Sequence, residues 1–120
     1  MKRAKGIKIK DLEPGTGKVA EVGHCVLVRF HCYLNRGDLV FTSESDPYPC
    51  QVELGKRRVW VGLEQGIPGM REGGVRRVSV SPQLAYYERW SHPEIPEDAV
   101  LRYEVELLRV SEEWDSTIYF

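Results

Sequence analysis

The chain has 120 residues, of which 42% are hydrophobic and 29% are charged, and its formal net charge at pH 7 is -1. This length suits one hydrophobic core and is short for two ordinary domains. A net charge so close to zero gives no overall attraction to nucleic acid or to a membrane surface. We therefore expect one domain over residues 1–120, with a core at about 7–110, a basic arm at 1–6 and an acidic, aromatic-ended tail at 111–120.

The first ten residues are basic and contain no long apolar run. A signal peptide or a membrane helix needs such a run, so we expect a cytoplasmic protein without a membrane partner. Lysine and arginine side chains in this arm and around Lys56 could contact phosphates, but no module of stacking aromatic residues accompanies them. A solvated surface is the favoured interpretation, and no nucleic-acid partner is expected.

Alternation of apolar and polar residues predicts strands in the first half of the chain. A short strand is expected at residues 7–9, and a long, half-buried one at residues 24–34, where every second residue is apolar. Residues 50–54 alternate in the same way. Turn-forming sequences with glycine or proline separate these segments, which favours antiparallel pairing between them.

The segment Val61–Gly74 predicts a short helix. Leu63, Ile67 and Met70 recur at helical spacing and would lie on one face of about two turns. Pro68 lies where a helix would end. We therefore expect a short helix with its apolar face against the rest of the molecule.

Two further strands are expected after the helix. In residues 75–80 an extra arginine breaks strict alternation, which indicates a bulge at Arg76 and Arg77. A strand is also expected at residues 100–110, where Leu101, Tyr103, Val105 and Leu107 alternate with polar residues. The sequence therefore predicts an α+β protein, a mostly antiparallel sheet with one short helix to cover it.

The three cysteines are an odd set, and two of them follow a histidine at positions 24 and 31. Thiolate and imidazole together could bind a metal or form a nucleophilic pair. However, a regular strand would point Cys25 and Cys32 to opposite faces, and no Cys-x-x-Cys spacing occurs. Reduced thiols in a core are the favoured interpretation, with no metal.

Seven segments follow one another in the order of a single family: PGTG, VLVRFHCYLNRGDLVF, ELG, GLEQGIPGM, REGGVRRVSVSPQLAY, HPEIPEDAVL and YEVELLRV. In these segments, from about Ile7 to Val110, the chain resembles the FKBP-type peptidyl-prolyl cis-trans isomerases, the macrolide-binding immunophilins. The resemblance implies a twisted antiparallel sheet wrapped around one short helix, with a ligand site in the cleft between them.

The resemblance also implies site residues, position by position. The residues matched to the catalytic positions are Phe30, Phe41, Tyr86 and Trp60. Those matched to the substrate-binding positions are Thr42, Cys50, Val59, Leu63, Ile95 and Tyr103. The backbone N–H of Trp60 corresponds to a donor that the family offers to the ligand.

Three of these positions depart from the family pattern. Leu63 stands where the family usually has a tryptophan at the pocket floor, and Thr42 stands where it commonly has an aspartate. Cys50 replaces an aromatic wall. These departures imply a less rigid pocket, weaker macrolide binding and reduced activity.

Two functions follow from this resemblance. The first is a monomeric isomerase without cofactor that acts on Xaa-Pro bonds of peptides, unfolded proteins and client proteins. The second is a catalytically weak or inactive peptide-binding domain, acting as a chaperone or adaptor. Phe30, Phe41 and Tyr86 favour the enzyme, whereas Leu63 and Thr42 favour the adaptor.

The tail allows two interpretations. Its aromatic and aliphatic side chains could dock on the domain or on a partner: Trp114, Ile118, Tyr119 and Phe120. A frayed terminus is an equally ordinary outcome.

Overall fold

The structure is a computed structural model that describes residues 5–35, 37–42, 50–56, 60–85, 88 and 92–117. For residues 41 and 42 the description covers the backbone and leaves out the side chains. The predicted site residues Val59 and Tyr86 lie outside the described part of the chain.

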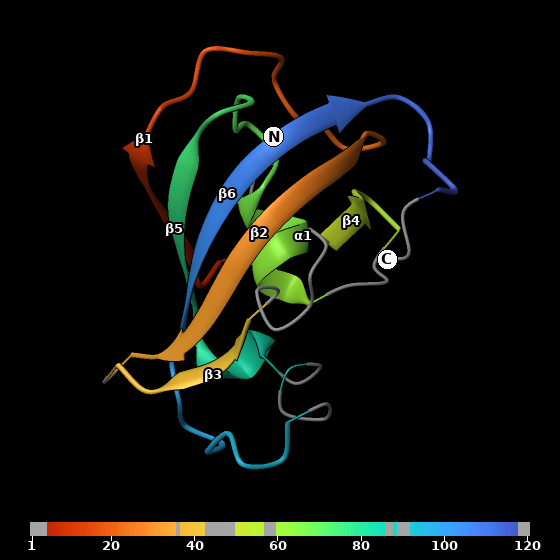
Figure 1. The fold of residues 1–120 in the computed structure, drawn as a ribbon. Helices are drawn as coiled ribbons and strands as arrows, with labels where there is room; N and C mark the ends of the chain where they lie inside the picture. The colour runs from red at the N-terminus through yellow and green to blue at the C-terminus, as the bar shows by residue number, and fades with distance from the viewer. Residues whose placement is uncertain are drawn as a thin grey trace.

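The described residues form a six-stranded antiparallel sheet with the order β1-β5-β6-β2-β3, in which β4 also pairs with β2. The elements are β1 (Ile7–Glu13), β2 (Cys25–Leu34), β3 (Leu39–Thr42), β4 (Cys50–Glu53), α1 (Val61–Gly66), β5 (Val75–Val80), the 3-10 turn η2 (Pro82–Leu84) and β6 (Leu101–Ser111). The long strands β2 and β6 run side by side through the middle (Figure 1).

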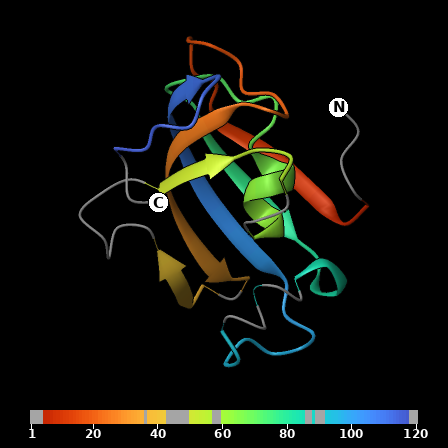
Figure 2. The same cartoon turned by 90° about the vertical axis from the view of Figure 1, so that its right-hand side faces the viewer.

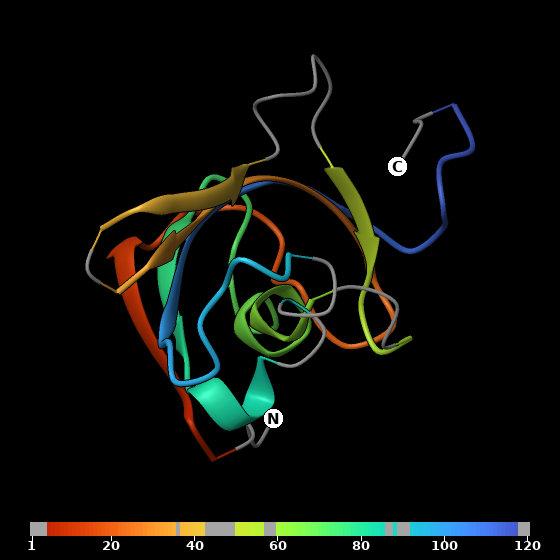
Figure 3. The same ribbon diagram turned by 90° about the horizontal axis from the view of Figure 1, so that it is seen from below.

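The sheet curves around the helix α1, which is seen almost end-on in Figure 3. From the side, α1 lies against one face of the sheet with β5 and β6 behind it (Figure 2). This arrangement confirms the predicted α+β class and the twisted sheet around one short helix. No helix within the described ranges is long and apolar enough to cross a membrane.

Alternation of side chains along the two central strands builds the core. In β2 the side chains of Val28, Phe30 and Cys32 are buried, as expected for the face toward α1. The opposite face carries charge pairs between strands. Arg29 lies 3.8 Å from Glu106 across the β2–β6 pair, so this face is solvated.

Three strands differ from the expected pattern. β1 extends well beyond the predicted residues 7–9. The prediction is too short because β1 is a largely exposed edge strand, and such a strand shows little apolar alternation. β3 is a four-residue strand that apolar alternation does not predict. In β6 the register shifts, since Leu27 pairs with Arg109 but Val28 pairs with Leu107. The extra residue in β6 is a bulge after the last strictly alternating position.

The predicted bulge at Arg76 and Arg77 is wrong for β5, because the extra residue at this position lies in β1, where Asp11 pairs with Arg76 and Glu13 pairs with Val75. Residues 75–80 pair with β6 without a break in register, and Arg76 is 4% exposed on the core side with Val78 and Val80. The guanidinium is accommodated there because it has acceptors. Its Nε donates to Oδ1 of Asp11 at 2.6 Å, and its Nη1 donates to the carbonyls of Gly66 at 2.9 Å and Pro68 at 3.1 Å.

The helix α1 spans six residues and ends at Gly66, with Ile67 as its C-cap residue immediately before Pro68. Leu63, Ile67 and Met70 are all buried as expected, but the helix is shorter than the predicted two turns, so that Met70 lies beyond its end. Gly62 allows a close approach to the sheet, because a Cβ at this position would overlap the ring of Tyr103. A helix this short is not stable alone in water, so its contacts with the sheet hold it in place.

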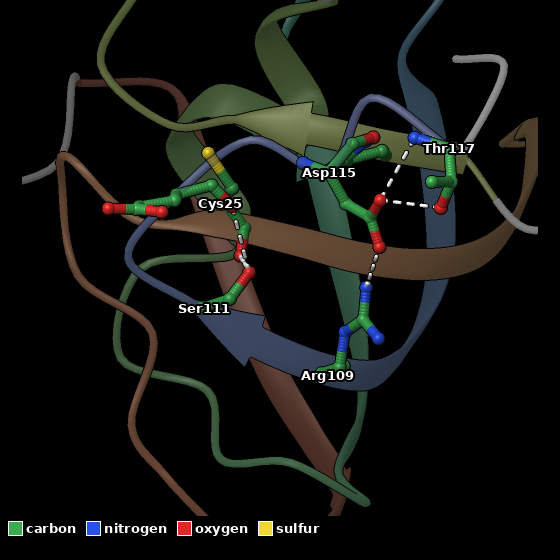
Figure 4. Close-up of polar contacts among 7 residues, drawn as sticks. Cys25, Arg109, Ser111, Asp115 and Thr117 are labelled. Atoms are coloured by element: carbon green, nitrogen blue, oxygen red, sulfur yellow. Dashed lines mark hydrogen bonds and ion pairs between the residues drawn. The ribbon is translucent and has the colours of Figure 1, made fainter.

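The described part of the tail, residues 112–117, docks beside β4 through polar contacts. The side chain of Gln51 donates to the carbonyl of Asp115 and accepts its N–H, both at 2.9 Å. The Asp115 carboxylate in turn accepts from Arg109 at 3.2 Å and from the Thr117 hydroxyl at 2.6 Å (Figure 4). Trp114 is 47% exposed, so it is not the anchor. The other three predicted docking residues, 118–120, lie outside the described part.

The Asp115 carboxylate gives this contact a pH dependence. Hydrogen bonds from Thr117, followed by Arg109, lower the pKa of the Asp115 carboxyl below its ordinary value of 3.8. A lowered carboxyl pKa stabilises the folded form above pH 3.8, and the contribution is lost as the pH falls through the lowered pKa.

We expect Arg76→Leu to lower the free energy of unfolding by about 3–5 kcal/mol, because it leaves two carbonyls at the end of α1 and the Asp11 carboxylate without their donor. Arg76→Lys should rescue little, since one ammonium cannot span these acceptors. Urea unfolding of Arg77→Leu is the matched control. Arg77 lies on the solvated face in a pair with Glu104, so its loss should cost less than about 1 kcal/mol. Equal losses for the two leucine variants would contradict this assignment.

Deletion of residues 112–120 should lower the free energy of unfolding by about 1–3 kcal/mol, since it leaves the buried Gln51 amide without Asp115. Thr117→Val keeps both Gln51 bonds and should cost less than about 1 kcal/mol. Thermal melting and sedimentation measure the outcome. If the truncated chain keeps the parent's melting temperature and oligomeric state, the tail has no docking role.

Candidate functional site

Three aromatic side chains from distant parts of the sequence meet beside the start of α1. Phe30 comes from β2, Trp60 immediately precedes α1, and Tyr103 comes from β6. The ring centroids of Phe30 and Trp60 are 5.8 Å apart in an edge-to-face arrangement, and those of Phe30 and Tyr103 are 6.1 Å apart. These separations lie in the range of attractive aromatic pairs. We call Phe30, Trp60 and Tyr103 the aromatic cluster.

Aliphatic side chains extend the same apolar region. Leu63 from α1 and Ile95 from the segment before β6 are buried in the core that contains Phe30 and Tyr103, and Trp60 packs against this core. The structure therefore brings together five of the ten predicted site residues. Of the three rings, Phe30 is 3% exposed and Tyr103 is 0% exposed, whereas Trp60 is partly exposed.

The other predicted site residues are placed less completely. Cys50 is half-buried in β4 and pairs with Val28 in the ladder. Phe41 pairs with Cys32, and Thr42 pairs with His31, in the β2–β3 ladder. The roles of all ten predicted site residues, Val59 and Tyr86 included, stay predictions.

Two residues that the sequence analysis did not single out lie next to Trp60. Glu88 is 0% exposed, and its Oε1 accepts the N–H of Val61 at 3.2 Å. The ring centroid of His92 is 6.0 Å from that of Trp60. No sequence signal identifies either residue, because a glutamate or histidine between turn residues is ordinarily solvated.

Burial and the nearby Glu88 charge keep the Tyr103 phenol and the Cys32 thiol protonated. Desolvation, followed by the nearby Glu88 charge, raises the pKa of the Tyr103 phenol well above its ordinary value. The same two causes raise the pKa of the Cys32 thiol to about 12. At neutral pH Cys32 is therefore a neutral thiol and a poor nucleophile.

The cysteines are core thiols rather than a reactive pair. Cys25 and Cys32 are buried and Cys50 is half-buried, and none of the three forms a disulfide. Burial also raises the pKa of Cys25. Within the ranges that the structure describes, no group of three His, Cys, Asp or Glu side chains could hold a metal ion. The site can supply apolar contact, aromatic faces and backbone hydrogen bonds.

This architecture coincides with a family match over most of the chain. Residues 17–108 match the family described as FKBP-type peptidyl-prolyl cis-trans isomerase. The chain belongs to this family. The match covers β2 to β6 and α1, and thus all three members of the aromatic cluster.

Relatives of two lengths share this FKBP-type domain. The chain is 37% identical over 110 residues to FK506-binding protein 4 of Aspergillus oryzae, which covers 92% of this chain and 23% of that protein. It is 35% identical over 107 residues to the FK506-binding protein of Neisseria meningitidis serogroup B, which covers 89% of this chain and 98% of that protein. The chain thus spans about a quarter of the fungal relative and nearly all of the bacterial one.

The raised thiol pKa predicts selective labelling of the native FKBP-type domain. With a pKa of about 12, only about one Cys32 in ten thousand is a thiolate at about pH 8. We expect a thiol reagent to modify the half-buried Cys50 before Cys32, and to reach Cys32 only after unfolding in denaturant. Peptide mass spectrometry of the labelled protein measures this order, with Cys50→Ser as the matched control. Labelling of native Cys32 as fast as Cys50 would contradict the burial-raised pKa.

Proposed function

We propose that this chain is a peptidyl-prolyl cis-trans isomerase that acts on Xaa-Pro bonds in peptides and in unfolded or client proteins. The observation that carries the proposal is the aromatic cluster beside α1 in a chain of the FKBP-type family. One of its rings, Trp60, is accessible to a ligand without movement of the core.

The chemistry suits an apolar site. Rotation about an Xaa-Pro bond breaks amide resonance, which sets a barrier of about 18–20 kcal/mol and an uncatalysed time of tens to hundreds of seconds. The twisted amide has less charge separation than the planar one, so apolar surroundings stabilise it relative to the ground state. No bond is formed or broken in this reaction, and each 1.36 kcal/mol of preferential stabilisation gives about a tenfold gain in rate.

In this proposal the described residues have distinct roles. The prolyl ring packs on Trp60 at the accessible edge of the aromatic cluster, while Phe30 and Tyr103 support that ring from beneath. The backbone N–H of Trp60, by its resemblance to the family's ligand donor, binds a substrate carbonyl. Leu63 supplies an apolar floor without the indole that the family usually has.

A peptide-binding domain without useful catalysis is the second candidate. It is favoured by Leu63 and Thr42, which depart from the family pattern, and by the nearly complete burial of Phe30, Leu63 and Tyr103. The relatives are named for binding FK506. We propose that this macrolide also binds here, with lower affinity because Leu63 and Thr42 alter the pocket.

The test is the isomerisation rate of an Ala-Leu-Pro-Phe peptide at micromolar enzyme, measured both by coupled proteolysis and by NMR exchange. We expect acceleration over buffer by the wild-type chain. Phe30→Leu should lower kcat/KM by about tenfold, since it removes both aromatic contacts within the cluster. Phe41→Ala and Tyr86→Phe test the two aromatic residues whose side chains the structure does not describe.

Trp114→Leu is the matched control, because Trp114 is an exposed aromatic residue of the tail. Its kcat/KM should equal that of the wild type. Peptide binding seen by NMR without any acceleration would favour the binding domain, and absence of both binding and acceleration would exclude both candidates.

A further inference from the structure

Glu88 is a buried carboxylate that the proposed chemistry leaves unused. It is 0% exposed, although a buried ionisable group is costly unless polar groups compensate for the lost water. Its side chain compensates by accepting the Val61 N–H at 3.2 Å. Its position in the sequence is two residues after the predicted site residue Tyr86.

The Val61 N–H belongs to the peptide group that joins Trp60 to α1. The carbonyl of the same peptide accepts the N–H groups of Leu63 at 3.0 Å and Glu64 at 3.1 Å. Both polar ends of this peptide are therefore bonded, one to the helix and one to Glu88. Because a peptide group is planar, these bonds fix its orientation and restrict the Trp60 backbone beside it.

A second contact joins the same segment to Trp60. The N–H of His92 donates to the backbone carbonyl of Glu88 at 2.8 Å, and the His92 ring packs 6.0 Å from the Trp60 ring. The Glu88 carboxylate thus contacts the peptide group that follows Trp60, and the His92 ring contacts the Trp60 ring.

Two groups that keep their protons, the Tyr103 phenol and the Cys32 thiol, are affected by the Glu88 charge. Burial and the Glu88 charge raise the pKa values of Tyr103 and Cys32, so the phenol and the thiol both keep their protons near neutral pH. The Glu88 carboxylate, which accepts the Val61 N–H, is therefore also close enough to Tyr103 to affect the pKa of its phenol.

We propose that Glu88 is a positioning residue for the isomerase site, which fixes the Trp60–Val61 peptide so that the Trp60 ring and backbone N–H are held in place for the substrate. The inference rests on the proposed isomerase function. What it requires of Glu88 is an acceptor oxygen that reaches Val61, rather than the negative charge itself.

Two polar substitutions at Glu88 in the full chain test separately the length of its side chain and its negative charge. Glu88→Gln keeps the length and an acceptor oxygen but loses the charge, and Glu88→Asp keeps the charge but is shorter by one methylene. We expect E88Q to retain kcat/KM within about threefold of the wild type, and E88D to lose about tenfold, since it loses a hydrogen bond to a charged group.

Glu72→Asp is the matched control. The Glu72 carboxylate also accepts a backbone N–H, that of Val110 at 2.7 Å, and this contact involves none of the proposed site residues. Hydrogen exchange of the Val61 amide and the indole NMR signal of Trp60 are read in all variants. We expect both to change in E88D and to stay close to wild type in E88Q and E72D.

The outcomes are distinguishable. A wild-type chain without acceleration overturns the isomerase function and this inference together. An active wild type with an equally active E88D overturns the inference alone, as does impaired E88Q beside active E88D, because charge would then be the property that matters. Parallel losses of kcat/KM and stability in E88D and E72D would reduce Glu88 to a structural residue.

Discussion

Opposite charges at the two ends of α1 hold the centre of this structure together. The helix has six residues, too few to be stable without outside contacts. At its beginning the Glu88 carboxylate accepts the Val61 N–H, and at its end the Arg76 guanidinium donates to two carbonyls. A helix prefers negative charge at its first turn and positive charge at its last. Both side chains come from other segments, so the sheet and the loop before β6 define where the helix begins and ends.

The site depends on this arrangement, because Trp60 is the residue that enters the helix. The family commonly places a carboxylate where this chain has Thr42, and here the buried carboxylate next to the aromatic cluster belongs to Glu88. Leu63 keeps the floor apolar while reducing its aromatic surface. The region thus combines departures from the family pattern at individual positions with aromatic rings, aliphatic side chains and a buried carboxylate.

Sequence periodicity predicted the elements whose burial follows a simple rule. Alternation identified β2 and β6 because one face of each is buried along most of its length, and the spacing of Leu63, Ile67 and Met70 identified the helix. It failed at Arg76, since a pattern that treats arginine as solvent-facing cannot foresee acceptors supplied by Asp11 and by the end of α1. It also missed β3, in which Leu39, Val40 and Phe41 are consecutive apolar residues and show no alternation.

The resemblance predicted site residues that periodicity could not. Among them, Phe30 makes ring contacts with Trp60 and Tyr103 although the three are far apart in the sequence, and Leu63 and Ile95 are buried in the same core. Glu88 was missed by both approaches, because its importance arises from a single hydrogen bond to a distant backbone group. Local sequence carries the tendency to form a strand or helix, whereas such pairings depend on the whole fold.

The position of β6 has a consequence for the order in which the molecule can form. It lies between β5 and β2, yet it is the last strand in the sequence. During synthesis on a ribosome, the β1–β5 pair and the strands paired with β2 can emerge earlier, but among the described strands no β-ladder joins these two parts until β6 has left the exit tunnel. Each part would meanwhile expose an unpaired strand edge, the kind of surface that associates with other chains. A protein proposed to assist the folding of others would thus complete its own fold late, through contacts between residues far apart in sequence.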